Sequence, residues 1–439
     1  MTESRGGAGA SVLLTGSTGF IGKVVLHELV RRRAELGIER VYLLVRRRGS
    51  RSAADRFRRE VATSGCFTQS AAAADILPAL ADMCEAVDGD IRDADLGLAP
   101  ADARRLHDSV THVIHCAASV RFDDPLEQAA RVNVTGALNV LEFARGCRRL
   151  QRFVDVSTAY VTPHTGSAHP VEEAPVALPF DADVAYADIL AGRADADALL
   201  AATRHPNTYT FTKCLAEALL VARQGDVPLS IVRPSTVSVC RQQPFAGWID
   251  SEAAHAAVAA RIAAGDLRVM RMDPSTVLDI VPCDVVADRI LACAFSPELQ
   301  RPLVIRHAVA GLALSLPLAR VLAAHVRWFS TNLVDRRVRV VYAGSSAVAY
   351  RLFDAACHRL PRRMRVMRAR LQGRRSAARR LENLGARLRY LNRTFHHFAH
   401  HTYDFRTAFP PLEGFDLRTY LDCVSAGIAR HLMGVAPES

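Results

Sequence analysis

Ser11-Val-Leu-Leu-Thr-Gly-Ser-Thr-Gly-Phe-Ile-Gly22 is the stretch of sequence that decides the fold. Its first residues form a short apolar run typical of a buried β-strand, and residues 23–35 have the apolar periodicity of a helix. Between them, glycine recurs at every third position, at Gly16, Gly19 and Gly22. Such glycines permit a tight turn, a close approach of the backbone to a diphosphate and a close helix-to-sheet contact. The stretch therefore predicts a strand, a phosphate-binding turn and a helix.

The second expected strand, Arg40–Val45, ends in three consecutive arginines that begin at Arg46. A protein that binds NAD usually has a carboxylate at this place to hold the ribose hydroxyls, whereas arginine suits the 2′-phosphate of NADP. We therefore expect NADPH rather than NADH, with Arg46 as the phosphate ligand. Arg47 and Arg48 are equally consistent with a solvated run of charge.

Two later strands are expected to complete the cofactor site. A strand over residues 84–91 brings Asp90 toward the adenine, and a strand over residues 111–117 leads into small residues whose backbone can lie against the cofactor. His115 in that strand is expected to be a packed residue. The residues expected to contact the cofactor are Gly16, Thr18, Gly19, Phe20, Ile21, Gly22, Arg46, Asp90, Ile91, Ala117, Tyr209, Lys213 and Pro234.

Tyr209 and Lys213 stand four residues apart within His205–Glu217, so a helix there places both side chains on one face. The phenol of tyrosine has an ordinary pKa of about 10. We expect the neighbouring ammonium group to lower the pKa of Tyr209 and make it a usable acid. Lysine occurs only at Lys23 and Lys213 among the 56 basic residues, which indicates that this position requires an ammonium group.

A fifth expected strand, Arg152–Val161, carries hydroxyl side chains in Val156-Ser157-Thr158-Ala159-Tyr160. Parallel-sheet enzymes keep their chemistry at the carboxyl ends of strands. Thr158 is the expected hydroxyl that orients a carbonyl group. Ser157 is the alternative, because a slip of one residue turns the side chain to the other face of the sheet.

The alternation of strands and helices up to about residue 300 predicts an α/β fold of the Rossmann type, a doubly wound parallel sheet. After Leu303 the pattern predicts helices only. We expect a disordered N-terminus over residues 1–9, an NADP-binding reductase domain with interspersed substrate-binding elements over 10–305, and a helical C-terminal domain over 306–439. Residues 162–204 form an insertion expected to act as a lid or as part of a substrate cleft.

The net charge of +11 is concentrated in Pro361–Tyr390, where eleven arginines face one acid, Glu382. Apolar residues recur between them at helical intervals, which predicts a packed helical cap with a solvated basic face. The alternative is a face that attracts anionic lipid headgroups or the phosphates of a large substrate. Nucleic acid is not an expected partner, because no recognised nucleic-acid motif accompanies the charge.

The ten cysteines show neither zinc-site spacing nor a disulfide framework, which indicates a reduced, cytoplasmic protein, peripheral at a membrane surface under the lipid interpretation. No export signal is evident, and the uncharged run Ala308–Ala319 is too short to cross a bilayer. His396, His397, His400 and His401 have metal-compatible i, i+4 spacing, but no carboxylate or thiolate partner is evident, so no metal site is expected.

With these motifs in place, the chain resembles the fatty acyl-CoA reductases, extended short-chain dehydrogenases/reductases with a C-terminal domain of the male-sterility type. The most specific matches are Pro-Asn-Thr-Tyr-Thr-Phe-Thr-Lys, ending at Lys213, and Gly-Trp-Ile-Asp, ending at Asp250. The C-terminal match over Phe395–Leu432 is looser. The sequence departs from the pattern at Thr402-Tyr403-Asp404-Phe405, where tryptophan usually precedes the phenylalanine, and at Cys283, where valine is usual.

The resemblance implies NADPH-dependent reduction of a long-chain fatty acyl-CoA thioester to an aldehyde and on to the primary alcohol. It assigns Tyr209 as the proton donor, Lys213 to the ribose hydroxyls and Thr158 to the carbonyl oxygen. The alternatives are a reductase that stops at the aldehyde, one that acts on a carrier-protein thioester or a free aldehyde, and one that acts on a sugar nucleotide or sterol. A non-catalytic NADP-binding sensor or scaffold is the alternative from another class.

Overall fold

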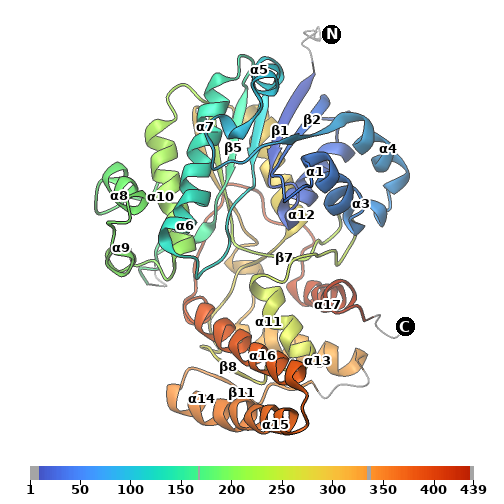
Figure 1. Cartoon of the computed structure of the whole chain (residues 1–439), viewed down its shortest axis with the longest axis vertical. Helices are drawn as coiled ribbons and strands as arrows, with labels where there is room; N and C mark the ends of the chain where they lie inside the picture. Colours follow the sequence, from blue (N-terminus) through green and yellow to red (C-terminus); the bar gives the residue numbers. More distant parts are fainter. Residues whose placement is uncertain (1–8, 167–168, 334–337, 436–439) are drawn as a thin grey trace.

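A computed structural model describes residues 9–166, 169–333 and 338–435 of the chain (Figure 1). The expected disorder of residues 1–9 therefore lies, apart from Gly9, outside the described residues. At the centre is a seven-stranded sheet in the order β10-β6-β5-β4-β1-β2-β3, in which every pair of neighbours is parallel. Its strands are β1 (Ala10–Thr15), β2 (Ile38–Val45), β3 (Cys84–Asp88), β4 (His112–His115), β5 (Arg152–Val156), β6 (Leu229–Pro234) and β10 (Leu303–Ala308).

The apolar run of β1 is buried because helices cover both faces of the sheet. Alternate side chains of a strand point to opposite faces. Val12 and Leu14 accordingly pack with one set of helices, and Leu13 packs with the other; all three are fully buried. On the first face lie α1 (Phe20–Arg31), α4 (Ala73–Met83) and α12 (Cys283–Phe295). On the second lie α5 (Pro100–Ser109), α7 (Gly136–Gly146) and α10 (Thr208–Arg223). This arrangement confirms the doubly wound parallel sheet.

A second lobe, drawn at the bottom of Figure 1, has its own apolar core. It contains α11 (Ala254–Ala263), α13 (Leu318–Asn332), α14 (Ala347–Asp354), α15 (Leu360–Leu371), α16 (Arg375–Thr394) and α17 (Leu417–Gly427), together with the short pair β8 (Val269–Arg271) and β11 (Tyr342–Gly344). Since α11 and β8 come from the chain before residue 306, this lobe is built from two separate stretches. The expected boundary at 305/306 itself stays a prediction.

The expectation that only helices follow Leu303 is wrong. β10 supplies an edge strand of the main sheet, where Val304 and Ala308 are buried beside β6, and β11 pairs with β8. The strand escaped recognition because Arg306 and His307 interrupt its short apolar run. None of the helices in the described ranges is both long enough and apolar enough to span a bilayer.

The predicted packing of the basic segment is only partly correct. Ala378 and Leu388 of α16 are buried, but Met364, Met367 and Leu371 of α15 are 66%, 60% and 83% exposed. α15 packs on α16 through its opposite side, which leaves its apolar row facing outward.

Candidate active site

The helix that carries the tyrosine and the lysine begins where the sequence predicts. Asn207 caps α10 by accepting a hydrogen bond from the backbone N–H of Thr210 at 2.9 Å. A cap of this kind typically stabilises a helix by about 1 kcal/mol. Tyr209 lies in the first turn and Lys213 one turn further, on the side of α10 that faces the sheet. The cap therefore fixes where the two side chains enter the site.

Lys213 is buried against the end of β5. Its Nζ lies 3.4 Å from Oδ2 of Asp155, and the two side chains are 1% and 0% exposed. The other carboxylate oxygen of Asp155 lies 4.0 Å from Nε2 of His115. The opposite ring nitrogen of His115 is hydrogen-bonded to the hydroxyl of Thr15 at 2.7 Å. Burial and the nearby ammonium lower the pKa of His115 to about 3, so its ring is neutral.

Tyr209 does not have the acidic phenol that the sequence predicted. Burial raises its pKa to about 12, a hydrogen bond with Thr158 lowers it in part, and the carboxylate of Asp155 raises it further. The expected lowering of this pKa is wrong for this structure, because burial of the phenol dominates and the Asp155 carboxylate acts in the same direction. Tyr209 is consequently a protonated phenol at neutral pH.

Between the two candidate hydroxyls at the end of β5, Thr158 is the one that contacts the tyrosine. Its hydroxyl is hydrogen-bonded to the Tyr209 phenol and donates to the carbonyl oxygen of Pro234 at 3.4 Å. Ser157 also lines the cavity, but its buried hydroxyl has no partner among the described residues. Thr158 thus lies where the sequence analysis expected it, and its role in orienting a carbonyl stays a prediction.

The glycine turn has the shape that a diphosphate requires. Gly16 adopts φ of 77°, a conformation that favours glycine. A Cβ at Gly22 would lie 2.1 Å from the carbonyl oxygen of Gly16, so no larger residue fits there. Gly19 precedes the first turn of α1, and no side chain caps that helix. The first-turn N–H groups are therefore available to an anion, as in dinucleotide-binding folds. The residues present fit a dinucleotide.

A cavity of about 200 Å³ continues from this turn to the ends of β2 and β3. The guanidinium of Arg46 stands at its edge, 59% exposed and only loosely paired with Asp90 at 4.0 Å. Arg56 and Arg92 line the same cavity, and the sequence analysis missed both. Arg92 is held by Asp90 at 2.7 Å, which leaves Arg46 as the less compensated charge. No motif marks these two arginines in the sequence.

The expected cofactor residues divide between two adjoining cavities. Thr18, Arg46, Asp90, Ile91 and Ala117 line the smaller one, Phe20, Ile21, Gly22, Tyr209 and Pro234 line the larger one, and Gly16 and Gly19 line both. Lys213 lines neither, because its side chain is buried against Asp155.

The larger cavity, about 410 Å³, extends from Tyr209 and Thr158 into the second lobe. Its far wall is apolar and comes from α11, β8, the segment that follows β8, and α13. The wall residues are Val258, Met270, Leu278, Leu318, Val321 and Leu322. No described residue of the insertion 162–204 lines this cavity, but Leu200 lines a neighbouring outer cavity beside Thr208, so the role of the insertion as a lid or as part of the substrate cleft stays a prediction. That segment forms α8 (Ala182–Leu190) and α9 (Ala196–Thr203), which lie beside α10 (Figure 1).

Two ion pairs that the sequence did not reveal, one buried and one partly exposed, hold the site together. Arg233 of β6 and Glu217 of α10 form a bidentate pair whose shortest contact is 2.6 Å, with almost no solvent exposure. Lys23, the second lysine, pairs with Asp250 at 2.5 Å and ties α1 to the Gly-Trp-Ile-Asp segment. Both pairs join residues on separate elements, and their spacing in the sequence carries no sign of them.

The four histidines within residues 396–401 stack on one another in two pairs. The rings of His396 and His400 stack with centroids 4.1 Å apart, and those of His397 and His401 stack at 4.4 Å. Nε2 of His397 is hydrogen-bonded to the Tyr403 hydroxyl at 2.9 Å. Within the described ranges no three histidine, cysteine or acidic side chains converge as metal ligands.

Because the glycine turn and the Tyr209 hydroxyl open into one continuous space, the molecule is a Rossmann-type protein built to bind a nicotinamide dinucleotide. Comparison with known proteins gives the family. The model of the family described as male sterility protein, an NAD-binding domain, matches residues 14–290. The chain belongs to this family, which bears out the resemblance inferred from its motifs.

Curated relatives include fatty acyl-CoA reductase 2 of Bos taurus, 30% identical over 301 residues, and fatty acyl-CoA reductase 1 of Xenopus laevis, 33% identical over 297. Each alignment covers 67% of this chain, but the chain spans only 56% of the relative. Among solved structures, the terminal R domain from the myxalamid biosynthetic pathway is similar, with a TM-score of 0.67 at 21% identity, covering 99% of this chain and 94% of that one. At this identity, the likeness shows the fold.

Proposed function

We propose that this protein reduces a long-chain fatty acyl-CoA thioester to the primary alcohol through the aldehyde, with NADPH as the reductant. The observation that carries the proposal is the continuity between Tyr209 and the apolar wall of the 410 Å³ cavity. A thioester carbonyl at Tyr209 would place its hydrocarbon chain against α11 and α13, where burial stabilises it by roughly 0.8 kcal/mol per methylene group. The names of the curated relatives support the same substrate class.

NADPH is the proposed form of the cofactor because a guanidinium, rather than a carboxylate, stands at the end of β2. Arg46 is exposed, and its nearest carboxylate is 4.0 Å away and already bonded to Arg92. A 2′-phosphate would supply the close anionic partner that Arg46 lacks. The bound cofactor supplies the hydride that reaches the carbonyl carbon.

The chain's own residues would act on the carbonyl oxygen. The Thr158 hydroxyl would turn its one proton from the Pro234 carbonyl to this oxygen and orient it, and Tyr209, held protonated by burial, would give its proton as negative charge develops there. Return of the hemithioacetal hydroxyl proton to the Tyr209 phenolate, with loss of the thiolate, breaks the carbon–sulfur bond, leaves the aldehyde and restores the phenol. A second hydride and a second proton convert the aldehyde to the alcohol. Lys213 lines neither cavity and is paired with Asp155, so the contact with the ribose hydroxyls that the family resemblance implies stays a prediction.

Product analysis tests the proposal. Purified protein given palmitoyl-CoA and NADPH should release free coenzyme A and hexadecanol, with two NADPH oxidised per thiol released. Accumulation of hexadecanal with one NADPH per thiol would establish the rival that stops at the aldehyde. Absence of NADPH oxidation with palmitoyl-CoA, palmitoyl carrier protein and hexadecanal alike would favour a non-catalytic NADP-binding protein.

A further inference from the structure

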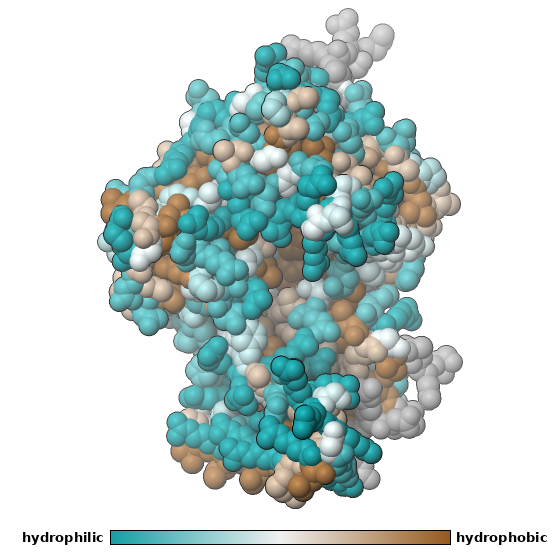
Figure 2. Space-filling model, in the orientation of Figure 1, coloured by the Kyte–Doolittle hydropathy of each residue, from teal (hydrophilic) through white to brown (hydrophobic). Residues whose placement is uncertain are grey.

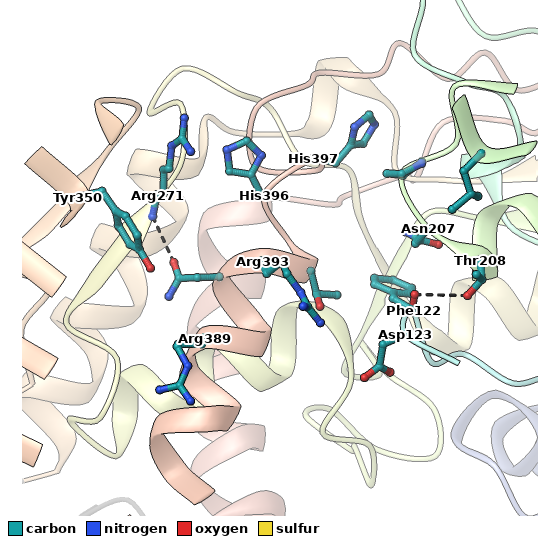
Figure 3. A pocket seen from close by; sticks show the side chains of 14 residues that line it. Phe122, Asp123, Asn207, Thr208, Arg271, Tyr350, Arg389, Arg393, His396 and His397 are labelled. Atoms are coloured by element: carbon teal, nitrogen blue, oxygen red, sulfur yellow. Dashed lines mark hydrogen bonds between the residues drawn. The ribbon is translucent and has the colours of Figure 1, made fainter. Parts of the chain in front are cut away.

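A third cavity, about 690 Å³, opens between the two lobes and is lined by Thr208, the residue before Tyr209 (Figure 3). Arg271, Arg389 and Arg393 come from the helical lobe, and Phe122 and Thr208 line the opposite side (Figure 3). We propose that this groove binds the phosphate groups of coenzyme A, an inference that rests on the proposed function and names how the thioester's carrier is held.

The charge of the groove is not compensated. Within the described part of the chain, none of its three guanidinium groups has a carboxylate partner; the Nε of Arg271 donates only to the Ser345 carbonyl oxygen at 3.4 Å. By contrast, Arg370 and Arg387 in the same lobe are paired with Glu382 and Glu252. Arginines left without acids around a concave surface suit a ligand that brings its own negative charge.

The single acid in the groove does not cancel this charge. Asp123 lies 3.8 Å from Arg121 and accepts a hydrogen bond from the hydroxyl of Tyr390 at 3.3 Å. Arg271 is held in place by its backbone N–H, which donates to Asn392 at 3.2 Å. The groove thus presents three guanidinium groups and a few neutral donors to an anion.

The groove adjoins the catalytic cavity at Phe122. Phe122 lines both this groove and the catalytic cavity, and its ring stacks on Tyr209 with centroids 5.5 Å apart. Thr208, the residue before Tyr209, also lines the groove. A pantetheine arm anchored by its phosphates at the arginines would pass Phe122 and present its thioester to Tyr209. Three cations suit the several phosphate charges of coenzyme A better than the single phosphodiester of a carrier protein.

The test compares two double variants on the same helix. Arg389→Gln with Arg393→Gln removes two groove cations, and Arg379→Gln with Arg380→Gln removes two exposed cations of α16 that do not line the groove. The groove variant should raise KM for palmitoyl-CoA by roughly tenfold or more while kcat stays near wild type. Its KM for the N-acetylcysteamine thioester of palmitate, which lacks phosphates, should not change. An unchanged KM for palmitoyl-CoA, or an equal rise in the control, would overturn the inference.

A binding measurement separates this inference from the proposed function. With NADP⁺ saturating the dinucleotide site, titration calorimetry should show that coenzyme A binds wild type and binds the groove variant at least roughly tenfold more weakly. That result would support the groove even if palmitoyl-CoA is not turned over. If wild type and the groove variant both turn over palmitoyl-CoA and bind coenzyme A equally well, the groove is not the coenzyme A site, but the proposed function stands. If the groove variant loses affinity for a palmitoyl carrier protein but not for coenzyme A, the groove does not bind coenzyme A.

An independent observation concerns the outer surface of α14 and α15. Their exposed large apolar residues form what we call the distal apolar face, made of Val348, Leu352, Leu360, Met364, Met367 and Leu371, each at least 56% exposed. The four positions on α15 share one side of the helix. Brown atoms line the lower edge of the second lobe, beside teal residues, in Figure 2. Apolar side chains exposed in such a row mark an interaction site.

We infer that the distal apolar face lies on an anionic membrane surface, with α14 and α15 in the plane of the headgroups. Arginine is the charged residue that dominates this region: Arg362, Arg363, Arg365 and Arg368 lie within α15. A helix with an apolar side flanked by arginines is the pattern of an interfacial helix on anionic lipid. A second copy of the chain is a poorer occupant, because its own arginines would meet these across the contact.

Vesicle flotation tests the membrane inference. Wild type should float with phosphatidylcholine vesicles that contain phosphatidylglycerol and should not float with phosphatidylcholine alone. Met364→Ser with Met367→Ser and Leu371→Ser should abolish flotation, whereas Val184→Ser, an equally exposed valine on α8, should not. Retained NADPH binding shows that the triple variant is folded. Equal flotation of wild type on both vesicles, or of the triple variant and wild type, would overturn the inference, as would conversion of a wild-type dimer to a monomer by the triple variant.

Discussion

The ammonium group of Lys213 lies 3.4 Å from the carboxylate of Asp155, and both side chains are out of contact with solvent. Removing one member of a buried pair leaves the other charged and unpaired, which typically costs about 3 to 5 kcal/mol. We expect Asp155→Ala to lower the free energy of unfolding by that amount in urea titrations. Asp288→Ala is the matched control, because it breaks an exposed pair with Arg32 at 2.8 Å and should cost less than about 1 kcal/mol. Equal losses in the two variants would contradict the importance of the buried pair.

Tyr209→Phe should reduce kcat by roughly a hundredfold or more, because it removes the proposed proton donor. NADPH binding, measured by fluorescence titration, should remain close to wild type. Tyr160→Phe provides the control. Tyr160 lines the same cavity, but its hydroxyl is hydrogen-bonded to Thr236 at 2.9 Å rather than to Thr158. A Tyr209→Phe protein with the turnover of Tyr160→Phe would remove Tyr209 from the mechanism.

Arg46→Ala should weaken NADPH binding by roughly tenfold to a hundredfold and leave NADH binding unchanged, because only NADPH carries the 2′-phosphate. The neighbouring Arg47 is bonded to Asp88 at 2.9 Å, so Arg47→Ala should affect neither cofactor. The measurement is the dissociation constant of NADPH and of NADH for wild type, Arg46→Ala and Arg47→Ala. If the two variants discriminate between cofactors as wild type does, Arg46 is not the phosphate ligand.

Acid should destabilise the protein well before its carboxylates are protonated. Burial lowers the pKa of His112, His255, His307 and His397 to about 4 and that of His115 to about 3. Below the ordinary histidine pKa of about 6.5 the unfolded chain therefore binds protons that the folded chain does not. The free energy of unfolding should be highest above that pH and fall as the pH drops toward 4.

Urea unfolding at about pH 7.5 and about pH 5 measures this loss, which is on the order of 1 to 2 kcal/mol for each buried histidine. His255→Asn should reduce the difference between the free energies of unfolding at the two pH values, since the ring of His255 is buried against His325. His169→Asn, at an exposed position, should leave the difference unchanged. A protein as stable at the lower pH as at the higher would contradict the pKa directions.

Local patterns in the sequence predicted the sheet, the glycine turn and the Tyr-Lys helix. Those features depend on residues close together in the chain, such as the apolar run before Gly16 and the Asn207 cap. The Asp155 partner of Lys213 could not be predicted in this way, because it comes from a different strand. For the same reason the pKa of Tyr209 was predicted in the wrong direction, since burial of the phenol and the carboxylate of Asp155 both raise it.

The second lobe was harder to predict because it is assembled from two stretches of chain. The cavity wall combines Val258 and Met270 from before β10 with Leu318 and Leu322 from after it. Helical periodicity in α15 correctly predicted an apolar side but not which side packs on α16. Packing between elements that are distant in the sequence determines both the make-up of the cavity wall and the side of α15 that contacts α16.

Isotope transfer measures whether the protein delivers two hydrides to the carbonyl carbon of a thioester. The protein would be given palmitoyl-CoA and NADPH deuterated at both hydrogens of the nicotinamide C4, and the hexadecanol would be analysed by mass spectrometry. The account predicts alcohol with two deuterium atoms on carbon 1, formed together with free coenzyme A. No deuterated product from palmitoyl-CoA, alongside singly deuterated alcohol from hexadecanal, would contradict it.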